Sequence, residues 1–121
     1  MKIIGIGTDI VNIKRIEKIC KKNKQSFLKK IFTKKELLIL NNLKLNQDSK
    51  IAMRFAAKEA FSKALGTGFG KNLSFLDIEV LSHSSGKPYF FLKKKKYKKI
   101  NCNLRMSDDY PWALAFVIIS R

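Results

Sequence analysis

The stretch RFAAKEAFSKALGTG, residues 54–68, decides the fold because it predicts a central helix that ends in glycine. We expect this helix to run from about residue 50 to Leu65. Ser49 offers a hydroxyl to the first turn, and Gly66 can take the left-handed conformation that closes a helix. Glu59 is the only acid in the stretch, among three basic side chains.

Glycine-rich segments follow this helix and stand near the N-terminus. Thr67 and Gly68 extend the loop beyond what a helix stop requires, and backbone N–H groups with little side-chain cover can cradle an anion. GIGTDI (5–10) has Ile10 where a dinucleotide fingerprint needs its third glycine, and GTGFG (66–70) follows a helix instead of a strand. Neither segment therefore predicts a nucleotide cofactor by the usual motifs.

The N-terminal half is predicted to hold one strand and further helices. KIIGIG (2–7) is typical of a strand, with Asp9 following its end, and residues 12–23 have apolar positions at helical spacing under a basic outer face. Residues 26–32 indicate a further helical turn. Thr33 and Glu36 form a capping box, which predicts a helix to about Leu43.

The C-terminal half is predicted to be mostly strands. Residues 73–82 and 89–93 indicate a hairpin, and 103–107 and 112–120 indicate a final one. KKKKYKK (93–99) is typical of a solvated helix or loop. We therefore expect an α+β fold, a small antiparallel sheet packed with helices, in a single domain over residues 1–121.

Composition limits the possible functions. The chain has 121 residues, 45% of them hydrophobic, and no apolar run long enough for a membrane span. The N-terminal MKIIGIGTDIV is a poor signal peptide, so we expect a cytoplasmic protein. Twenty-two lysines and four arginines give a net charge of +17, which predicts an anionic partner. Cys20 and Cys102 lack metal or disulfide spacing, and His83, the only histidine, lies in a serine-rich turn.

Two carboxylates have both a plain and a chemical interpretation. Asp9 can be a turn or helix cap, and Glu59 can pair with Lys63 one turn further on. Taken together, two carboxylates and water suit Mg²⁺, which commonly completes its shell with substrate phosphates. Arg54, Lys58 and Lys63 can flank the same ligand.

GIGTDIV, RFAAKEAFSKALGTG, GKP and YPWALAFVII stand in this order along almost the whole chain. In these segments the sequence resembles the holo-[acyl-carrier-protein] synthases, which are small 4'-phosphopantetheinyl transferases. The resemblance implies transfer of 4'-phosphopantetheine from coenzyme A to a serine of apo-acyl carrier protein, in support of fatty acid biosynthesis. The second product is adenosine 3',5'-bisphosphate. It also implies an α+β homotrimer with active sites between subunits, and neither a nucleic-acid nor a membrane partner.

The resemblance also assigns residues. Asp9 and Glu59 would bind Mg²⁺, with Mn²⁺ left open, and Glu59 and Lys63 would both be catalytic, either of them serving as the base. The coenzyme A site would be lined by Arg54, Lys58, Lys63, Gly66, Thr67, Gly68, Lys87 and Pro88. One departure is Met106-Ser107-Asp108, where many members have serine-histidine, so no histidine role carries over and that of Asp108 is open.

The resemblance implies a function for the basic first helix, because acyl carrier proteins are acidic. We expect it to steer carrier protein through charge, and the alternative is a generic lysine-rich face. Two other hypotheses stay open. The net charge and KKKKYKK favour a nucleic-acid-binding module, which does not explain the placement of Asp9 and Glu59, and the intact acidic pair argues against a trimeric scaffold with a decayed site. The docking residues are predicted to be Lys14, Arg15, Lys18, Lys21 and Lys22.

Overall fold

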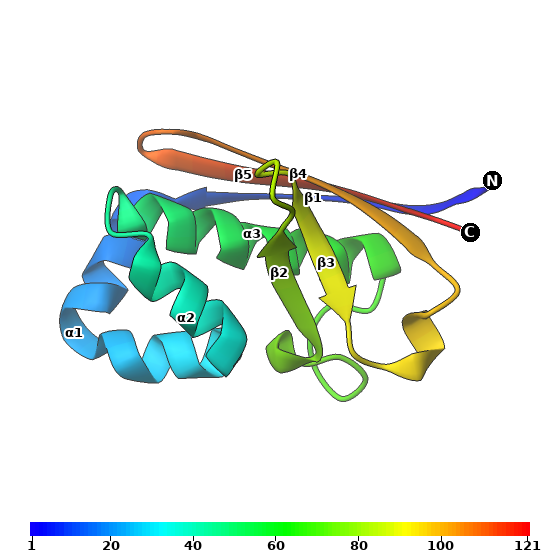
Figure 1. The fold of residues 1–121 in the computed structure, drawn as a ribbon, viewed down its shortest axis with the longest axis horizontal. Coiled ribbons are helices and arrows are strands. Elements are labelled where there is room, and N and C mark those ends of the chain that lie inside the picture. Colours follow the sequence, from blue (N-terminus) through cyan, green and yellow to red (C-terminus); the bar gives the residue numbers. More distant parts are fainter.

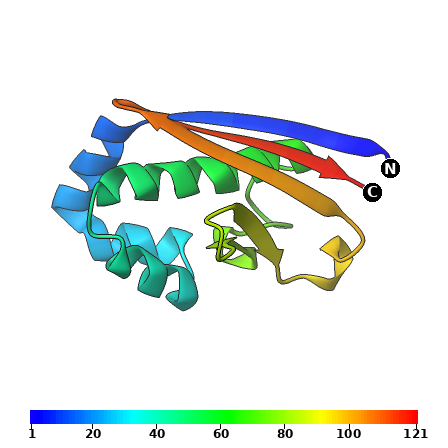
Figure 2. The same cartoon turned by 45° about the horizontal axis from the view of Figure 1, so that its top comes forward.

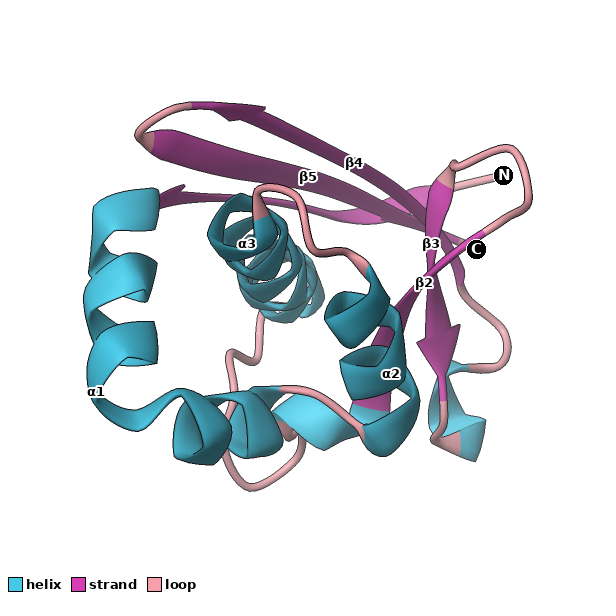
Figure 3. Cartoon of the chain, turned by 60° about the vertical axis from the view of Figure 1, so that its left-hand side comes forward, coloured by secondary structure: helices cyan, strands magenta, loops and turns pink.

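The fold is a three-stranded antiparallel sheet with a buried helix beneath it. The computed structural model describes residues 1–121. The sheet has the order β1-β5-β4, and Figure 1 shows α3 running beneath it, with α1 and α2 at one end and the β2–β3 hairpin beside α3. The helices all lie on one side of the sheet in Figures 2 and 3. The α+β prediction is thereby confirmed. The elements are β1 (Ile3–Asn12), α1 (Ile13–Ile31), α2 (Lys34–Asn42), α3 (Gln47–Leu65), β2 (Ile78–Ser82), β3 (Pro88–Leu92), β4 (Asn101–Asp109) and β5 (Trp112–Ser120).

Helix α3 is the centre of the core because its side chains are small enough to be enclosed on several sides. Ala56, Ala60 and Ala64 are buried toward the strands, and Phe61 packs on Phe90 of the hairpin. The helix ends where the sequence predicts, at Gly66 in the left-handed conformation with φ of 80°. A helix buried this extensively shows little amphipathic pattern. Its alanine-rich composition therefore predicts the helix better than the spacing of its apolar residues does.

Several predicted boundaries were wrong. Strand β1 continues to Asn12, so Asp9 lies within it, because β5 supplies pairing partners along the whole segment. Helix α3 begins at Gln47 after Asn46, with no side-chain cap, and Ser49 lies inside the helix. Strand β2 begins only at Ile78, because residues 75–77 form a short 3-10 helix.

The other predicted elements are confirmed. The helix expected over residues 12–23 and the helical turn expected over 26–32 form one helix, α1 (Ile13–Ile31), which is kinked at Asn23. The capping box of Thr33 and Glu36 starts α2. The lysine-rich run 93–99 contains a short 3-10 helix with Tyr97 buried.

Candidate active site

Asp9 and Lys63 meet where β1 crosses the last turns of α3. The Lys63 Nζ donates to Asp9 Oδ1 at 2.9 Å and to the Thr8 carbonyl at 3.1 Å. The side chains are 53% exposed for Lys63 and 15% exposed for Asp9, so the lysine side chain stays in contact with solvent. The predicted alternative, a pair between Lys63 and Glu59, is not among the ion pairs of the chain.

Two glycines allow the strand to lie this close to the helix. A Cβ on Gly7 would stand 2.0 Å from the Ala60 carbonyl oxygen, and one on Gly5 would stand 1.9 Å from that of Ala64. Only a residue without a side chain fits such a backbone approach. Gly5, Gly7 and Asp9 alternate along β1 on the face toward α3. The glycines of GIGTDI thus set the distance between the Asp9 strand and the α3 helix.

Glu59 faces the same region from α3. Burial raises the pKa of the Glu59 carboxyl, and the nearby charge of Asp9 raises it further, while Lys63 and Arg15 lower it. The two carboxylates therefore repel each other across the strand–helix contact. Arg15 projects from α1, so three elements contribute charge to one site, and sequence reasoning had placed Arg15 only on the docking face.

The loop after α3 is open and held at its ends. Gly66 and Gly68 have φ of 80° and 64°, and nothing lies within 4 Å of a Cβ built on either one. The Gly68 N–H donates to the Ser62 carbonyl at 3.2 Å, and the Thr67 hydroxyl donates to the Gly68 carbonyl. Further on, Phe69 stacks on Phe75 with ring centroids 3.8 Å apart. The loop therefore exposes backbone next to the end of α3.

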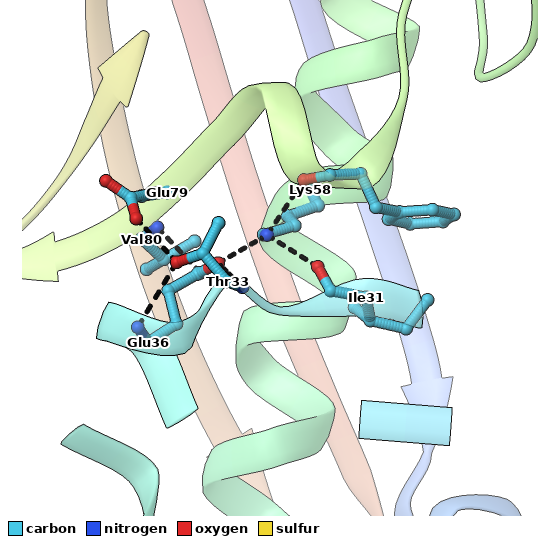
Figure 4. A network of polar contacts seen from close by, with 7 residues as sticks. Ile31, Thr33, Glu36, Lys58, Glu79 and Val80 are labelled. Atoms are coloured by element: carbon cyan, nitrogen blue, oxygen red, sulfur yellow. Dashed lines mark hydrogen bonds and ion pairs between the residues drawn. The ribbon is translucent and has the colours of Figure 1, made fainter. Parts of the chain in front are cut away.

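Lys58 lies elsewhere, in the buried network of Figure 4. It is 0% exposed, and its ammonium donates to Glu36 at 2.7 Å and to the carbonyls of Ile31 and Phe75 at 2.7 and 2.9 Å. Glu36 also accepts from the Val80 N–H at 2.9 Å. Burial lowers the pKa of Lys58, and the negative charge of Glu36 opposes that effect. All three ammonium protons are used within the chain, so Lys58 has none left for a ligand.

Arg54 is also largely buried, at 8% exposure. One of its terminal nitrogens donates to the Lys50 carbonyl at 3.2 Å, and its Nε has no partner. Burial lowers the pKa of this guanidinium, and Glu36 partly offsets the shift. Unlike Lys58, Arg54 therefore keeps unused N–H donors.

The remaining predicted residues lie on other elements. Lys87 and Pro88 stand at the β2–β3 turn, where their backbone contacts stay within the hairpin, and nothing joins them to Asp9 or Glu59. Asp108 is exposed on β4 opposite Ala113. Lys14 is exposed at the start of α1. The rest of the predicted docking face lines one surface pocket on α1, formed by Arg15, Lys18, Ile19, Lys21 and Lys22.

The donor set at the site is all oxygen. No three histidine, cysteine or acidic side chains gather anywhere in the chain. Both cysteines are free thiols. No helix is both long and apolar enough to cross a membrane. The chemistry available at the site is the two carboxylates, the Lys63 ammonium, the Arg15 guanidinium and the open backbone of the loop, which together suit a cation with a phosphate.

Comparisons with known proteins identify the family of the chain. Residues 5–115 match the 4'-phosphopantetheinyl transferase superfamily. The holo-[acyl-carrier-protein] synthase of Ruthia magnifica subsp. Calyptogena magnifica is 46% identical, over 97% of this chain and 96% of the relative. The crystal structure of the Neisseria meningitidis synthase has a TM-score of 0.88 at 42% identity, covering 98% of this chain and 99% of that one. The Helicobacter pylori synthase, solved in complex with coenzyme A, has a TM-score of 0.86 at 40% identity, covering 95% and 99%.

The chain belongs to the 4'-phosphopantetheinyl transferase superfamily and is a transferase of that class. Within the superfamily it groups with the holo-[acyl-carrier-protein] synthases, with which it aligns almost end to end. The resemblance stated from the sequence motifs is confirmed.

Proposed function

We propose that this chain transfers 4'-phosphopantetheine from coenzyme A to a serine of apo-acyl carrier protein. Holo-acyl carrier protein and adenosine 3',5'-bisphosphate are the products. The convergence of Asp9, Glu59 and Lys63 at the β1–α3 contact carries the proposal, because this chemistry needs charge neutralisation more than a covalent group of the enzyme. The similarity to a relative solved with coenzyme A supports the donor substrate.

Mg²⁺ is the cation that this site fits best. Asp9 and Glu59 would hold it, because both offer hard oxygen ligands and their mutual repulsion favours a cation between them. When bound, Mg²⁺ would neutralise charge on the pyrophosphate of coenzyme A. Mn²⁺ has the same ligand preferences, so the metal dependence should hold for both.

The chain's own residues bind and orient the pyrophosphate. Lys63, half exposed and flexible, would contact the phosphate oxygens. Arg54 would contribute through a terminal guanidinium nitrogen, because its unpaired Nε is buried. The open backbone of the loop at Gly66, Thr67 and Gly68 would line the same substrate, as would Lys87 and Pro88 of the hairpin turn. Lys58 is left out of this set because its ammonium is fully used inside the chain.

The serine hydroxyl of the carrier protein is the nucleophile, and it attacks the phosphorus that carries the pantetheine arm. The bond from this phosphorus to the bridging oxygen of the pyrophosphate breaks, and the bisphosphate leaves with the electron pair. A base must take the hydroxyl proton. Glu59, through a bound water, is the better candidate, because a carboxylate can accept a proton whereas the Lys63 ammonium has no free lone pair.

Acyl carrier protein would dock on α1. The basic pocket of this helix includes Arg15, whose charge also reaches Glu59, so the docking face adjoins the site. Reversal of the charges of Lys18, Lys21 and Lys22 should raise the Michaelis constant for carrier protein and leave that for coenzyme A unchanged. Equal increases for both substrates would contradict docking on this face.

We further propose that the enzyme is a homotrimer assembled through the outer face of the sheet. Ile6 and Ile10 of β1 are 56% and 61% exposed, and Phe116 of β5 is 39% exposed. An apolar sheet face of this kind without a covering element typically marks an interface. A role in fatty acid biosynthesis and a cytoplasmic location stay predictions.

The direct test is incubation with coenzyme A, Mg²⁺ and apo-carrier protein, followed by mass spectrometry of the carrier protein. We expect its mass to rise by one phosphopantetheine group. Asp9→Asn and Glu59→Gln should remove this gain while the circular dichroism spectrum stays unchanged. A carrier protein of unchanged mass with the wild-type enzyme would refute the proposed function.

A further inference from the structure

Lys63 is hydrogen-bonded to one of the two carboxylates that would hold the proposed cation. Its Nζ lies 2.9 Å from Asp9 Oδ1 and 3.1 Å from the Thr8 carbonyl. A divalent ion ligated by Asp9 would bring a second and larger positive charge to the same carboxylate. Two cations at a few ångströms repel each other, so Lys63 and the ion cannot both keep their best positions.

The side chain of Lys63 is able to leave. It is 53% exposed, so its ammonium can be hydrated on either side of a movement, and its four-carbon stem spans several positions. No other acid holds it, since its only ion pair is with Asp9. Lys58, five residues earlier on the same helix, contrasts with it, because that ammonium is enclosed and fixed by three acceptors.

We infer that Lys63 is an exchangeable counter-ion of Asp9, which a divalent cation displaces. This inference rests on the proposed function, because it assumes that Asp9 binds a metal there. The displaced ammonium is released beside the cation, at the position where it can contact a phosphate group. Metal binding and phosphate binding are thereby coupled through one side chain, and the Asp9–Lys63 pair lowers the affinity for metal alone.

The effect on metal affinity can be measured without turnover. Because the pair is partly exposed, its loss should strengthen Mn²⁺ binding by about two- to fivefold. We would measure binding of Mn²⁺ alone by isothermal titration calorimetry, with no coenzyme A present. The variants are Lys63→Gln, which removes the charge, and Lys63→Arg, which keeps it. Lys35→Gln, at an exposed position on α2, is the control for the change in net charge, and Asp9→Asn identifies the site.

The expected result is tighter Mn²⁺ binding by Lys63→Gln than by Lys35→Gln, while Lys63→Arg stays near the wild type. Suppose that Asp9→Asn abolishes Mn²⁺ binding but Lys63→Gln binds Mn²⁺ no more tightly than the control. That result would overturn the counter-ion role and leave Asp9 as a metal ligand. If Asp9→Asn binds Mn²⁺ as tightly as the wild type does, both the counter-ion role and the proposed metal ligand are overturned. Thermal melting of each variant confirms that the chain is folded during the titration.

The phosphate side of the coupling has its own readout. With adenosine 3',5'-bisphosphate as the probe, the wild type should bind more tightly when Mn²⁺ is present, and Lys63→Gln should lose part of this gain. A gain that is the same in both proteins would contradict delivery of Lys63 to the phosphate.

Discussion

The close contact of Gly7 with α3 predicts that Gly7→Ala will inactivate the enzyme. An added Cβ would lie 2.0 Å from the Ala60 carbonyl oxygen, whereas ordinary contact begins at 3.4 Å. The strand must therefore move by about 1.4 Å, since the obstacle is helix backbone and cannot rotate away. Asp9 is two residues along the same face of the strand and would move with it.

This displacement would separate Asp9 from Glu59 more than from Lys63. The flexible lysine can follow a moving carboxylate, but Glu59 has a short side chain on a helix that is packed on several sides. A misplacement of about 1 Å at a reacting site can cost on the order of 100-fold in rate. Overpacking of this kind also destabilises a fold by roughly 1–3 kcal/mol. We therefore expect a large loss of turnover and a moderate drop in melting temperature.

The assay is the rate of carrier-protein modification, measured by mass spectrometry and paired with thermal melting by circular dichroism. Thr8→Ala is a suitable control, because the Thr8 side chain is exposed. The substitution also keeps the backbone carbonyl that accepts from Lys63. A Gly7→Ala enzyme that works near the wild-type rate would show that the close approach does not set the site geometry.

Three further predictions concern stability and assembly. Lys58→Met should destabilise the fold by about 3–5 kcal/mol in urea unfolding, because the Glu36 carboxylate is left buried and unpaired. Lys58→Met with Glu36→Gln should recover part of this loss, because the amide is neutral but can still accept from the Val80 N–H; no recovery would show that the unpaired charge is not the cause. Burial raises the pKa of the Cys102 thiol to about 12, so iodoacetamide at pH 9 should react slowly with it until urea is added. The pKa of the thiol is higher in the folded chain than in the unfolded chain, so Cys102 stabilises the fold fully below about pH 8.5. This contribution to folding stability is lost as the pH rises toward 12. Rapid alkylation of the native chain would refute the raised pKa. Phe116→Glu should shift the sedimentation coefficient from trimer to monomer, and an unchanged value would argue against the proposed interface.

Local signals predicted the element types well. The capping box of Thr33 and Glu36 and the glycine after Leu65 act within a few residues, so their physics is visible in the sequence. The boundaries that depend on tertiary pairing were less accessible. Asp9 looked like the end of a strand because it is polar, yet pairing with Ala115 of β5 keeps it within β1.

The sequence predicted that Asp9, Glu59 and Lys63 lie together, but it did not predict that Lys58 lies in a separate buried network. Nothing local distinguishes Lys58 from Lys63, since both are lysines in one helix. Lys58 is buried because Glu36, 22 residues earlier, reaches it from α2, whereas Lys63 reaches β1. The close packing of Gly5 and Gly7 could not be predicted either, because it depends on carbonyls of a helix more than fifty residues away in the sequence. Alternating glycines on one side of a strand were the only available signal.

Strand β1 presents opposite properties on its two sides. Ile6 and Ile10 point outward and are exposed, while Gly7 and Asp9 point toward α3. Because side chains alternate strictly, a single-residue insertion within this strand would exchange the two sets, sending isoleucine against the helix and Asp9 outward. Chain-length changes in β1 should therefore be far less tolerated than point substitutions there, because one insertion changes the outer apolar face and the candidate site together.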